Sequence, residues 1–312
     1  MAIYHPIVAY PGIEDLNLLI EKALGEKIEA AQKIAESTFG IVYEVRLREY
    51  AGTVTVKWQK YRGRGATEMR QLQELGKYSC ARVATVLHYH TATKELPFEA
   101  LILDYIPGLP GTQVVPGDDE QANALANNII QILLCWHSVN NPDGYGKLDG
   151  PYYPRWLDYY GQRIEVYHAH IHNEDCEIHP IVIEAADKSF NRIEEILGYI
   201  EGEAVLIHSD FWLGNIIVDP ETSLVKGVID PLDAEWAERE IDLILLNWPW
   251  GERDYLLNLY LQKVNLRPGF PLRYAFYLFW YAIQNLVRLG WYDEVRTPQL
   301  AEKLEEEMRT YL

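Results

Sequence analysis

The sequence predicts an α+β protein with a small, β-rich N-terminal lobe and a larger, mainly helical C-terminal lobe. Alternating apolar and polar residues, typical of half-buried strands, are concentrated in residues 1–106, whereas helical spacing dominates residues 107–312. Between these parts lies Pro107-Gly108-Leu109-Pro110-Gly111, whose prolines and glycines interrupt regular structure. We therefore expect a hinge at this run and a domain boundary between residues 106 and 107.

The N-terminal part predicts a mostly antiparallel sheet that carries helices. The segment 28–35 fits a strand or a helix equally well, and Ala51-Gly52 indicates a hairpin between two alternating runs. The expected elements are a helix over 13–24, strands over 41–47 and 53–58, a helix over 67–75 that stops at Gly76, and strands over 83–87 and 100–105.

The C-terminal part predicts helices around one short group of strands. Only 205–230 has strand character, in two or three short pieces with a turn at Asp219-Pro220. The expected helices cover 119–137, 155–172, 180–199 and the remainder of the chain from 231 to 312.

Composition excludes several kinds of partner. With 28 Lys and Arg against 46 Asp and Glu, the formal charge of −18 repels nucleic acid and anionic lipid, so neither is expected to bind. The most apolar stretch, 274–283, is far shorter than the ~20 residues that cross a bilayer. We expect it to be a buried helix and the protein to have no membrane association.

The cysteines and the N-terminus predict a cytoplasmic protein. Cys80, Cys135 and Cys176 show neither close pairing nor the spacing of a zinc site, so we expect free thiols in a reducing compartment. The first residues, MAIYHPIVAYPGIEDLN, lack the basic segment and apolar run of a signal peptide.

The most informative run covers 206–217 and has the sequence LIHSDFWLGNII. Asn215 follows Asp210 by five positions, and Asp230 closes the next apolar segment. Transfer of a phosphoryl group from ATP needs such a set, because one carboxylate accepts the proton of the attacking hydroxyl while an amide and a second carboxylate hold Mg²⁺. We expect Asp210 to be the catalytic base, Asn215 and Asp230 to be metal ligands, and His208 to brace the loop. Turn preference alone explains single residues but not this spacing.

Lys57 and Glu68 are the expected phosphate-binding pair. Lys57 lies in the alternating strand TVTVKW, and Glu68 lies on the following helix, so the carboxylate is able to hold the ammonium toward the α- and β-phosphates. An edge-strand lysine and a solvated glutamate are the alternative. The downstream motif favours the pair.

Two weaker signals concern the nucleotide. Ser37 and Thr38 precede Phe39-Gly40 and the first clear strand, where backbone N–H groups are able to cover phosphates, although a plain turn explains the loop as well. Asp104 and Ile106 end the strand before the hinge, where backbone groups are expected to pair with the adenine edge. A strand that simply runs into a turn is the alternative.

For three further groups of residues, a structural role is favoured over a catalytic or binding role. Asp242 precedes an apolar run and is expected to cap a helix N-terminus. His168, His170 and His172, with Cys176 and His179 nearby, suggest a metal site, but residues two apart diverge on a helix, so a solvated face is favoured. The aromatic residues of 152–160 either line an acceptor pocket or, as their helical spacing favours, pack in the core.

These motifs resemble the aminoglycoside phosphotransferase-like superfamily of small-molecule kinases, which includes the fructosamine, choline and methylthioribose kinases. The usual signature, H-G-D-x-x-x-x-N followed by I-D and then by D-L, stands here as HSDFWLGN, VID and Asp242-Leu243. The segment LCWHSV at 134–139 is similar to the family's L-x-x-L-H-S helix, and LILDYIPG at 101–108 to its hinge strand. The whole-chain pattern is most similar to uncharacterised bacterial proteins of this family.

The resemblance implies a protein-kinase-like two-lobed fold, ATP with Mg²⁺, and phosphorylation of a hydroxyl group on a small molecule. The acceptor is expected to bind around 152–172 and the C-terminal helices; its identity and the oligomeric state stay open. Ser209 stands where glycine is usual, which keeps a catalytically inactive nucleotide-binding or scaffolding protein as the alternative. Protein kinase activity is disfavoured because no A-P-E element follows Asp230.

Overall fold

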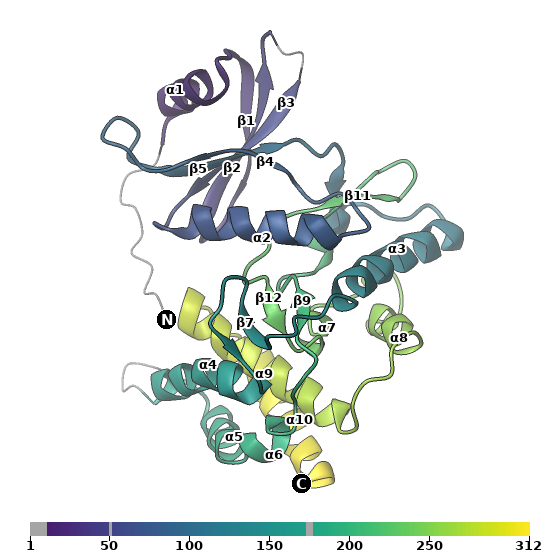
Figure 1. Ribbon diagram of the computed structural model, residues 1–312. Coiled ribbons are helices and arrows are strands. Elements are labelled where there is room, and N and C mark those ends of the chain that lie inside the picture. Colours follow the sequence, from purple (N-terminus) through teal and green to yellow (C-terminus); the bar gives the residue numbers. More distant parts are fainter. Residues whose placement is uncertain (1–10, 50–51, 173–176) are drawn as a thin grey trace. The chain divides into compact units, whose positions relative to one another are not determined.

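The computed structural model describes residues 11–49, 52–172 and 177–312, which form two compact units (Figure 1). The sheet unit consists of the described residues of Ala2–Cys135 together with Asp210–Asp233. The helical unit consists of Trp136–Ser209 and Ala234–Leu312. The predicted α+β class is confirmed, because an antiparallel sheet dominates the N-terminal part and helices dominate the C-terminal part. The lobe boundary between residues 106 and 107 stays a prediction.

The sheet unit contains a five-stranded sheet in the order β1-β2-β3-β5-β4, with every neighbouring pair antiparallel. The strands are β1 (Ile28–Glu36), β2 (Gly40–Leu47), β3 (Thr53–Gln59), β4 (Val86–His90) and β5 (Glu99–Asp104). The ambiguous segment 28–35 is therefore a strand. The strand expected over 83–87 begins at Val86, since Val83 and Ala84 instead pair with Val228.

One face of this sheet and helix α1 (Ile13–Leu24) form an apolar core. Its buried members from α1 and β3 are Leu16, Leu19, Ile20, Val54, Val56 and Trp58. Side chains alternate across a strand, so Lys57 and Gln59 point to the opposite face. There they meet helix α2 (Arg64–Tyr78), which lies across the sheet in Figure 1.

A second, three-stranded sheet of the same unit has the order β11-β10-β6 and contains β6 (Leu109–Pro110), β10 (Ile216–Val218) and β11 (Val225–Val228). Ile216 pairs with Val228 in the antiparallel β10–β11 hairpin, and the Ile229 N–H donates to the Asn215 carbonyl over 3.0 Å. The hairpin therefore places Asn215, just before β10, beside the chain that leads to Asp230.

The helical unit contains a small sheet in the order β8-β7-β12-β9. Its strands are β7 (Tyr145–Lys147), β8 (Tyr152–Tyr153), β9 (Val205–Ile207) and β12 (Glu235–Ala237). Three of them were not predicted, because strands of two or three residues are too short to show alternation. The expectation of unbroken helix beyond residue 230 is thus wrong at β12.

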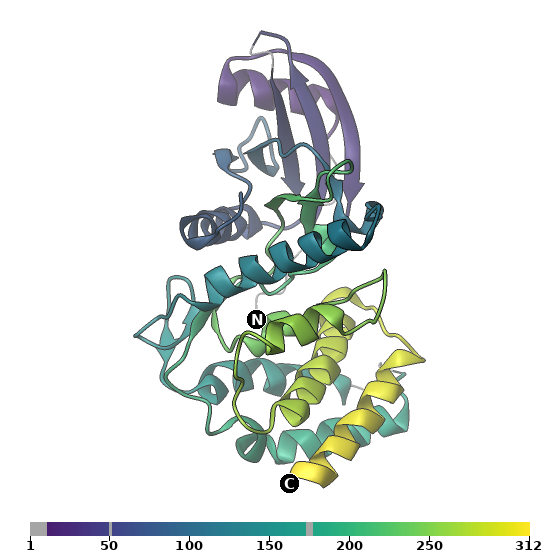
Figure 2. The ribbon, with the colours of Figure 1, turned by 90° about the vertical axis from the view of Figure 1, so that its right-hand side faces the viewer.

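Helices make up the rest of the described helical unit, and α9 and α10 lie side by side in it (Figure 2). They are α4 (Trp156–Ile171), α5 (Pro180–Asn191), α6 (Ile193–Leu197), α7 (Glu240–Leu243), α8 (Tyr255–Leu261), α9 (Phe270–Leu289) and α10 (Arg296–Tyr311). Helix α3 (Asp119–His137) belongs to the sheet unit except for its last two residues. The helix expected over 180–199 is interrupted at Arg192.

Among the described residues no helix combines the length and apolarity needed to cross a membrane.

The prediction of free thiols is wrong for two of the three cysteines, because Cys80 and Cys135 form a disulfide. Cys80 follows the end of α2 and Cys135 lies in the last turn of α3, with their Cα atoms 6.1 Å apart. Their separation of 55 residues along the chain gave no sign of this contact. Cys176 lies outside the described residues, and the cytoplasmic location stays a prediction.

Candidate active site

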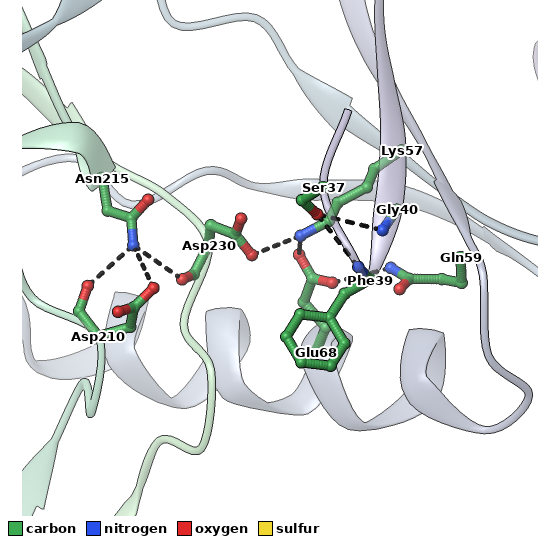
Figure 3. A network of polar contacts seen from close by, with 9 residues as sticks. All are labelled: Ser37, Phe39, Gly40, Lys57, Gln59, Glu68, Asp210, Asn215 and Asp230. Carbon is green, nitrogen blue, oxygen red and sulfur yellow. Dashed lines mark hydrogen bonds and ion pairs between the residues drawn. The ribbon is translucent and has the colours of Figure 1, made fainter. Parts of the chain in front are cut away.

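Lys57 on β3 lies between two carboxylates of the sheet unit (Figure 3). Its Nζ is 2.7 Å from Oε1 of Glu68 on α2 and 2.5 Å from Oδ1 of Asp230. The second oxygen of Glu68 accepts a 2.8 Å hydrogen bond from Nε2 of Gln59. The structure thus brings together three residues that the sequence predicted as parts of one site. Gln59 was missed, although it lies two positions beyond Lys57 and so shares its face of β3.

The surroundings of Lys57 fix its charge. The side chains of Lys57 and Glu68 are only 6% and 1% exposed. Burial alone would lower the pKa of Lys57, but the neighbouring carboxylates of Asp230 and Glu68 outweigh burial and raise its pKa above the ordinary value. Lys57 is therefore an ammonium at neutral pH. Two carboxyl groups thus lie beside one ammonium, and the carboxyl group of Asp230 is the more exposed of the two, at 42%.

Asn215 connects the two aspartates of the predicted catalytic motif (Figure 3). Its Nδ2 donates to the main-chain oxygen and to Oδ2 of Asp210, both at 2.8 Å, and more weakly to the main-chain oxygen of Asp230 at 3.4 Å. All three bonds use the amide nitrogen, so the amide oxygen is the atom of Asn215 that suits a metal ion. The orientation of the Asp210 side chain is fixed by the same bonds.

The oxygen donors of this site fit magnesium. Mg²⁺ prefers hard oxygen ligands and is usually held by one or two carboxylates together with phosphate oxygens and water. Asp230 supplies a carboxylate and Asn215 an amide oxygen, whereas a site for a softer metal would offer thiolate or imidazole. The donor set agrees with the metal that the sequence predicted.

The backbone is strained at two points of the motif. Ser209 has φ 68° and Asp230 has φ 57°, in the left-handed region that costs a non-glycine residue about 1 kcal/mol or more. Such residues are concentrated at functional sites. Ser209 adopts the conformation that glycine permits at this position, and its N–H donates to Oδ1 of Asp242 over 2.6 Å. The serine therefore keeps the turn that precedes Asp210.

Asp242 holds this turn, and the prediction that it caps a helix is wrong. It lies inside α7, fully buried, and its Oδ2 accepts a 2.9 Å hydrogen bond from the His208 N–H. His137 contacts the same oxygen through Nε2 at 3.3 Å. Asp242 thus fixes two successive amides directly before Asp210. An acidic residue between Ile241 and Leu243, in an otherwise apolar run, was the available signal.

The loop at Ser37 and Thr38, expected to lie over the nucleotide phosphates, has hydrogen bonds of its own. Ser37 forms the tip of the β1–β2 hairpin with Thr38, and its Oγ accepts hydrogen bonds from the N–H groups of Phe39 at 3.2 Å and Gly40 at 3.3 Å. These two amides, which were expected to cover phosphates, are thus engaged within the hairpin. A phosphate contact at this tip stays a prediction.

The strand end at Asp104 and Ile106 has structural contacts of its own. Asp104 accepts a 2.5 Å hydrogen bond from the Thr85 N–H and pairs with Arg82 at 2.6 Å, while Ile106 is buried. The side chain of Asp104 therefore stabilises the end of β5. Any adenine contact would come from the backbone, as the sequence predicted, and it stays a prediction.

The aromatic group of 152–160 packs mainly in the helical core. Trp156 is fully buried, stacks on Tyr160 with ring centres 4.7 Å apart, and donates to the Tyr277 hydroxyl over 3.0 Å. Tyr159 is different, because its hydroxyl donates over 2.6 Å to the buried carboxylate of Glu235, which also pairs with Arg163. The core interpretation is confirmed for Trp156 and Tyr160.

Comparison with known proteins assigns the family. A model of the phosphotransferase enzyme family matches residues 59–271, more than half of the chain, and the chain belongs to this family. The match includes Glu68, Asp210, Asn215 and Asp230 but begins two residues after Lys57, which contacts Glu68 in the structure. The resemblance found in the sequence is confirmed.

One sequence relative is the uncharacterised protein YcbJ of Escherichia coli (strain K12). It is 24% identical over 234 residues, which cover 73% of this chain and 76% of YcbJ. The similarity thus extends over most of both proteins, but YcbJ does not supply an acceptor.

Solved structures show the same fold. A fructosamine-3-kinase candidate from Haemophilus somnus 129PT superimposes with a TM-score of 0.70 at 17% identity, covering 94% of this chain and 97% of that one. A mutant of aminoglycoside phosphotransferase APH(4)-Ia, in complex with ADP and hygromycin B, gives 0.69 at 14% identity with the same coverage. The GDP and kanamycin complex of APH(2")-IIIa gives 0.63 at 12% identity, covering 95% and 99%. The chain therefore has the kinase-like fold of these phosphotransferases.

Proposed function

We propose that this protein is an ATP- and Mg²⁺-dependent phosphotransferase that phosphorylates a hydroxyl group of a small molecule. The observation that carries the proposal is the continuous network from Glu68 through Lys57 and Asp230 to Asn215 and Asp210. These residues come from one strand, one helix and the two segments that flank one hairpin, and the hairpin is far from the strand and the helix in the sequence. Turn preference explains none of their mutual contacts.

Asp210 is the proposed catalytic base. The acceptor hydroxyl donates a hydrogen bond to its carboxylate, the hydroxyl oxygen forms the new bond to the γ-phosphorus, and Asp210 takes up the proton. The bond between the γ-phosphorus and the oxygen that bridges to the β-phosphate breaks, and ADP leaves. The two hydrogen bonds from Asn215 hold the carboxylate in one orientation, so the base does not have to be ordered during the reaction.

Lys57 is the proposed contact to the α- and β-phosphates. Glu68 is almost completely buried and keeps the ammonium at the end of β3, while Gln59 holds Glu68 from the other side. Asp230 and Asn215 are the residues that would hold Mg²⁺, which, when bound, neutralises negative charge on the phosphates. Asp242 acts as a positioning residue, since it fixes the backbone before Asp210 without reaching the reacting atoms.

The structural relatives support a small acceptor. The APH(4)-Ia complex contains ADP with hygromycin B, and the APH(2")-IIIa complex contains GDP with kanamycin. Both combine a nucleotide with a compact polar molecule that carries several hydroxyl groups. We therefore place the acceptor of this protein among hydroxylated metabolites or drugs of that size, and we propose ATP as the phosphoryl donor.

The proposal is tested by a screen of hydroxylated small molecules with purified protein, MgATP and mass-spectrometric detection of phosphorylated products. We expect wild-type protein to phosphorylate at least one acceptor class and Asp210→Ala to lose about 10²–10⁴-fold in turnover, the usual contribution of a general base. Binding of MgATP should be retained in this variant, because Asp210 does not contact the phosphates in the mechanism.

Asp219→Asn is the matched control. Asp219 lies in the turn of the same β10–β11 hairpin but pairs with Lys226 at 3.0 Å, away from the catalytic network. This variant should turn over substrate as the wild type does. Normal turnover by Asp210→Ala would refute the assigned role, whereas MgATP binding without any phosphorylated product across the screen would favour the catalytically inactive alternative.

A further inference from the structure

Three polar side chains of the helical unit converge on one point that the proposed phosphotransfer does not use. His168 lies in the last turn of α4, His172 directly follows this helix as its C-cap residue, and Asp187 lies on α5. The Nε2 atoms of both imidazoles contact the same carboxylate oxygen, Oδ1 of Asp187, at 2.7 Å and 2.8 Å. The three donor atoms all lie within 4.8 Å of one another.

The spacing of the two histidines explains this convergence. His168 and the C-cap residue His172 are four residues apart, and residues at this spacing lie on the same side of a helix end. His170, between them, points to another side, which is why the alternate histidines do not act as one group. Helices α4 and α5 pack against each other, and Asp187 on α5 faces the histidine pair.

The donor set is typical of a borderline divalent transition metal ion. Two histidines one turn apart with a carboxylate from a second element form a ligand set found in zinc enzymes, with water in the fourth position. Ligand atoms at about 2.1 Å from a tetrahedral metal ion lie roughly 3.4 Å from one another. Each distance between an imidazole nitrogen and the Asp187 oxygen therefore has to increase by less than about 1 Å when the ion binds. Rotation of exposed side chains suffices for this.

The surroundings orient the ligands and leave them accessible. The ring of His168 stacks on Phe190 with centres 4.2 Å apart, which fixes its plane. His172 and Asp187 are 40% and 43% exposed, so an ion with bound water is able to enter from solvent. The lysine of α5, Lys188, pairs with Glu184 at 2.6 Å and with Glu305 at 3.0 Å.

We propose that His168, His172 and Asp187 bind one zinc-class divalent metal ion, which links α4 to α5. Imidazole nitrogens select such ions over Mg²⁺, so this site and the proposed magnesium site should not compete. The expected role is structural, because the ion would add a further link between two helices that already pack against each other. The inference stands independently of the proposed phosphotransferase activity.

The test uses the full chain without an affinity tag, freed of metal by chelator and dialysis. Titration with zinc chloride followed by calorimetry should show one tight equivalent, and the melting temperature should rise by a few degrees and fall again when chelator is added. Mg²⁺ at the same concentrations should cause neither effect. Co²⁺ bound in place of zinc should give the visible absorption of a low-symmetry site with nitrogen ligands.

Variants decide whether these three residues hold the ion. His172→Ala and Asp187→Ala should each weaken zinc binding at least about tenfold, since even indirect ligand contacts contribute that much. His170→Ala, a histidine removed from the same helix but from another face, should bind as the wild type does. The proposal would be overturned if the wild type did not bind zinc, or if His172→Ala and Asp187→Ala bound zinc as tightly as the wild type does. The three residues would then form only a hydrogen-bonded histidine–aspartate cluster.

Discussion

Among single residues, Lys57 is the positive charge on which the proposed binding of the nucleotide phosphates depends. It is buried on the polar face of β3, where it has carboxylates on both sides. Burial of an ammonium is costly unless paired charges and hydrogen bonds compensate for lost water. Glu68 provides such a paired charge even without a bound nucleotide. Lys57 is therefore held in one place before a nucleotide binds.

Removal of Lys57 should affect both stability and nucleotide binding. Lys57→Met leaves the buried carboxylate of Glu68 without its cation, and we expect the free energy of unfolding to fall by about 3–5 kcal/mol. The affinity for ATP should fall at least about tenfold, because the phosphates lose the positively charged side chain that we propose contacts them. Urea unfolding and calorimetric titration measure the two effects.

Lys60→Met is the control for this substitution. Lys60 follows the end of β3 and pairs with the exposed Glu36 at 2.9 Å, and a surface ion pair of this kind contributes little to stability. The control should therefore retain nearly all stability and ATP affinity. If Lys57→Met bound ATP as tightly as Lys60→Met does, Lys57 would have no role at the phosphates.

At the scale of secondary-structure elements, the end of α3 is joined to α7 and α8 by one buried histidine. Nδ1 of His137 contacts the Tyr260 hydroxyl at 2.7 Å, and Nε2 contacts Asp242 at 3.3 Å. Burial lowers the pKa of His137 below its ordinary value in spite of the neighbouring Asp242 carboxylate. The histidine is therefore neutral in the folded protein at pH 7.

This lowered pKa predicts that acid destabilises the fold through His137. In the unfolded chain a histidine takes up a proton near pH 6.5, while folded His137 stays neutral to lower pH. Between these two pKa values the unfolded state binds more protons, so the free energy of unfolding must decrease as the pH falls below about 6.5. The contribution of one such group reaches at most about 1.4 kcal/mol per pH unit.

Denaturant unfolding of wild type and His137→Gln between pH 7.5 and pH 5.5 measures this contribution. The variant should be less stable at pH 7.5, because it loses the buried contacts to Tyr260 and Asp242. Its stability should also fall less steeply with acid than that of the wild type. Parallel pH curves for the two proteins would show that His137 does not titrate as described.

The disulfide links two further elements, because it connects the end of α2 to the last turn of α3. A bridge that closes a loop of 55 residues restricts the unfolded chain and contributes up to about 4 kcal/mol in the chain-entropy model. We expect reducing agent to lower the unfolding midpoint of the wild type. Cys135→Ser should start at the lower midpoint and show no response to the reductant, whereas Cys176→Ser should behave as the wild type. Equal responses by both variants would contradict the pairing of Cys80 with Cys135.

In the whole molecule, local sequence patterns predicted the long helices and strands and brought together the residues of the candidate catalytic motif. The helices over 13–24 and 119–137 match the structure to the residue, because one apolar face of several turns identifies them. The triad of Asp210, Asn215 and Asp230 was predictable because two of its members are close in sequence and the third ends the next strand. The antiparallel hairpin then converts that spacing into proximity.

Contacts between distant segments were not predictable in the same way. The disulfide, the histidine–aspartate cluster and the role of Asp242 each depend on helix packing, which apolar periodicity alone does not specify. The short strands β7, β8 and β12 also escaped prediction, since they are held by tertiary pairing rather than by alternation of their own. The sequence motif nevertheless identified the family, which the comparison with known proteins confirmed.

The proposed mechanism requires that Asp230 and Asn215 hold Mg²⁺ on a nucleotide whose phosphates contact Lys57. Calorimetric titration of wild type and Asp230→Asn with the non-hydrolysable ATP analogue AMP-PNP, with and without Mg²⁺, measures this dependence. We expect Mg²⁺ to strengthen nucleotide binding by the wild type at least about tenfold and to leave nucleotide binding by Asp230→Asn almost unchanged. Failure of the wild type to bind the nucleotide, or an equal effect of Mg²⁺ on both proteins, would refute this role of Asp230.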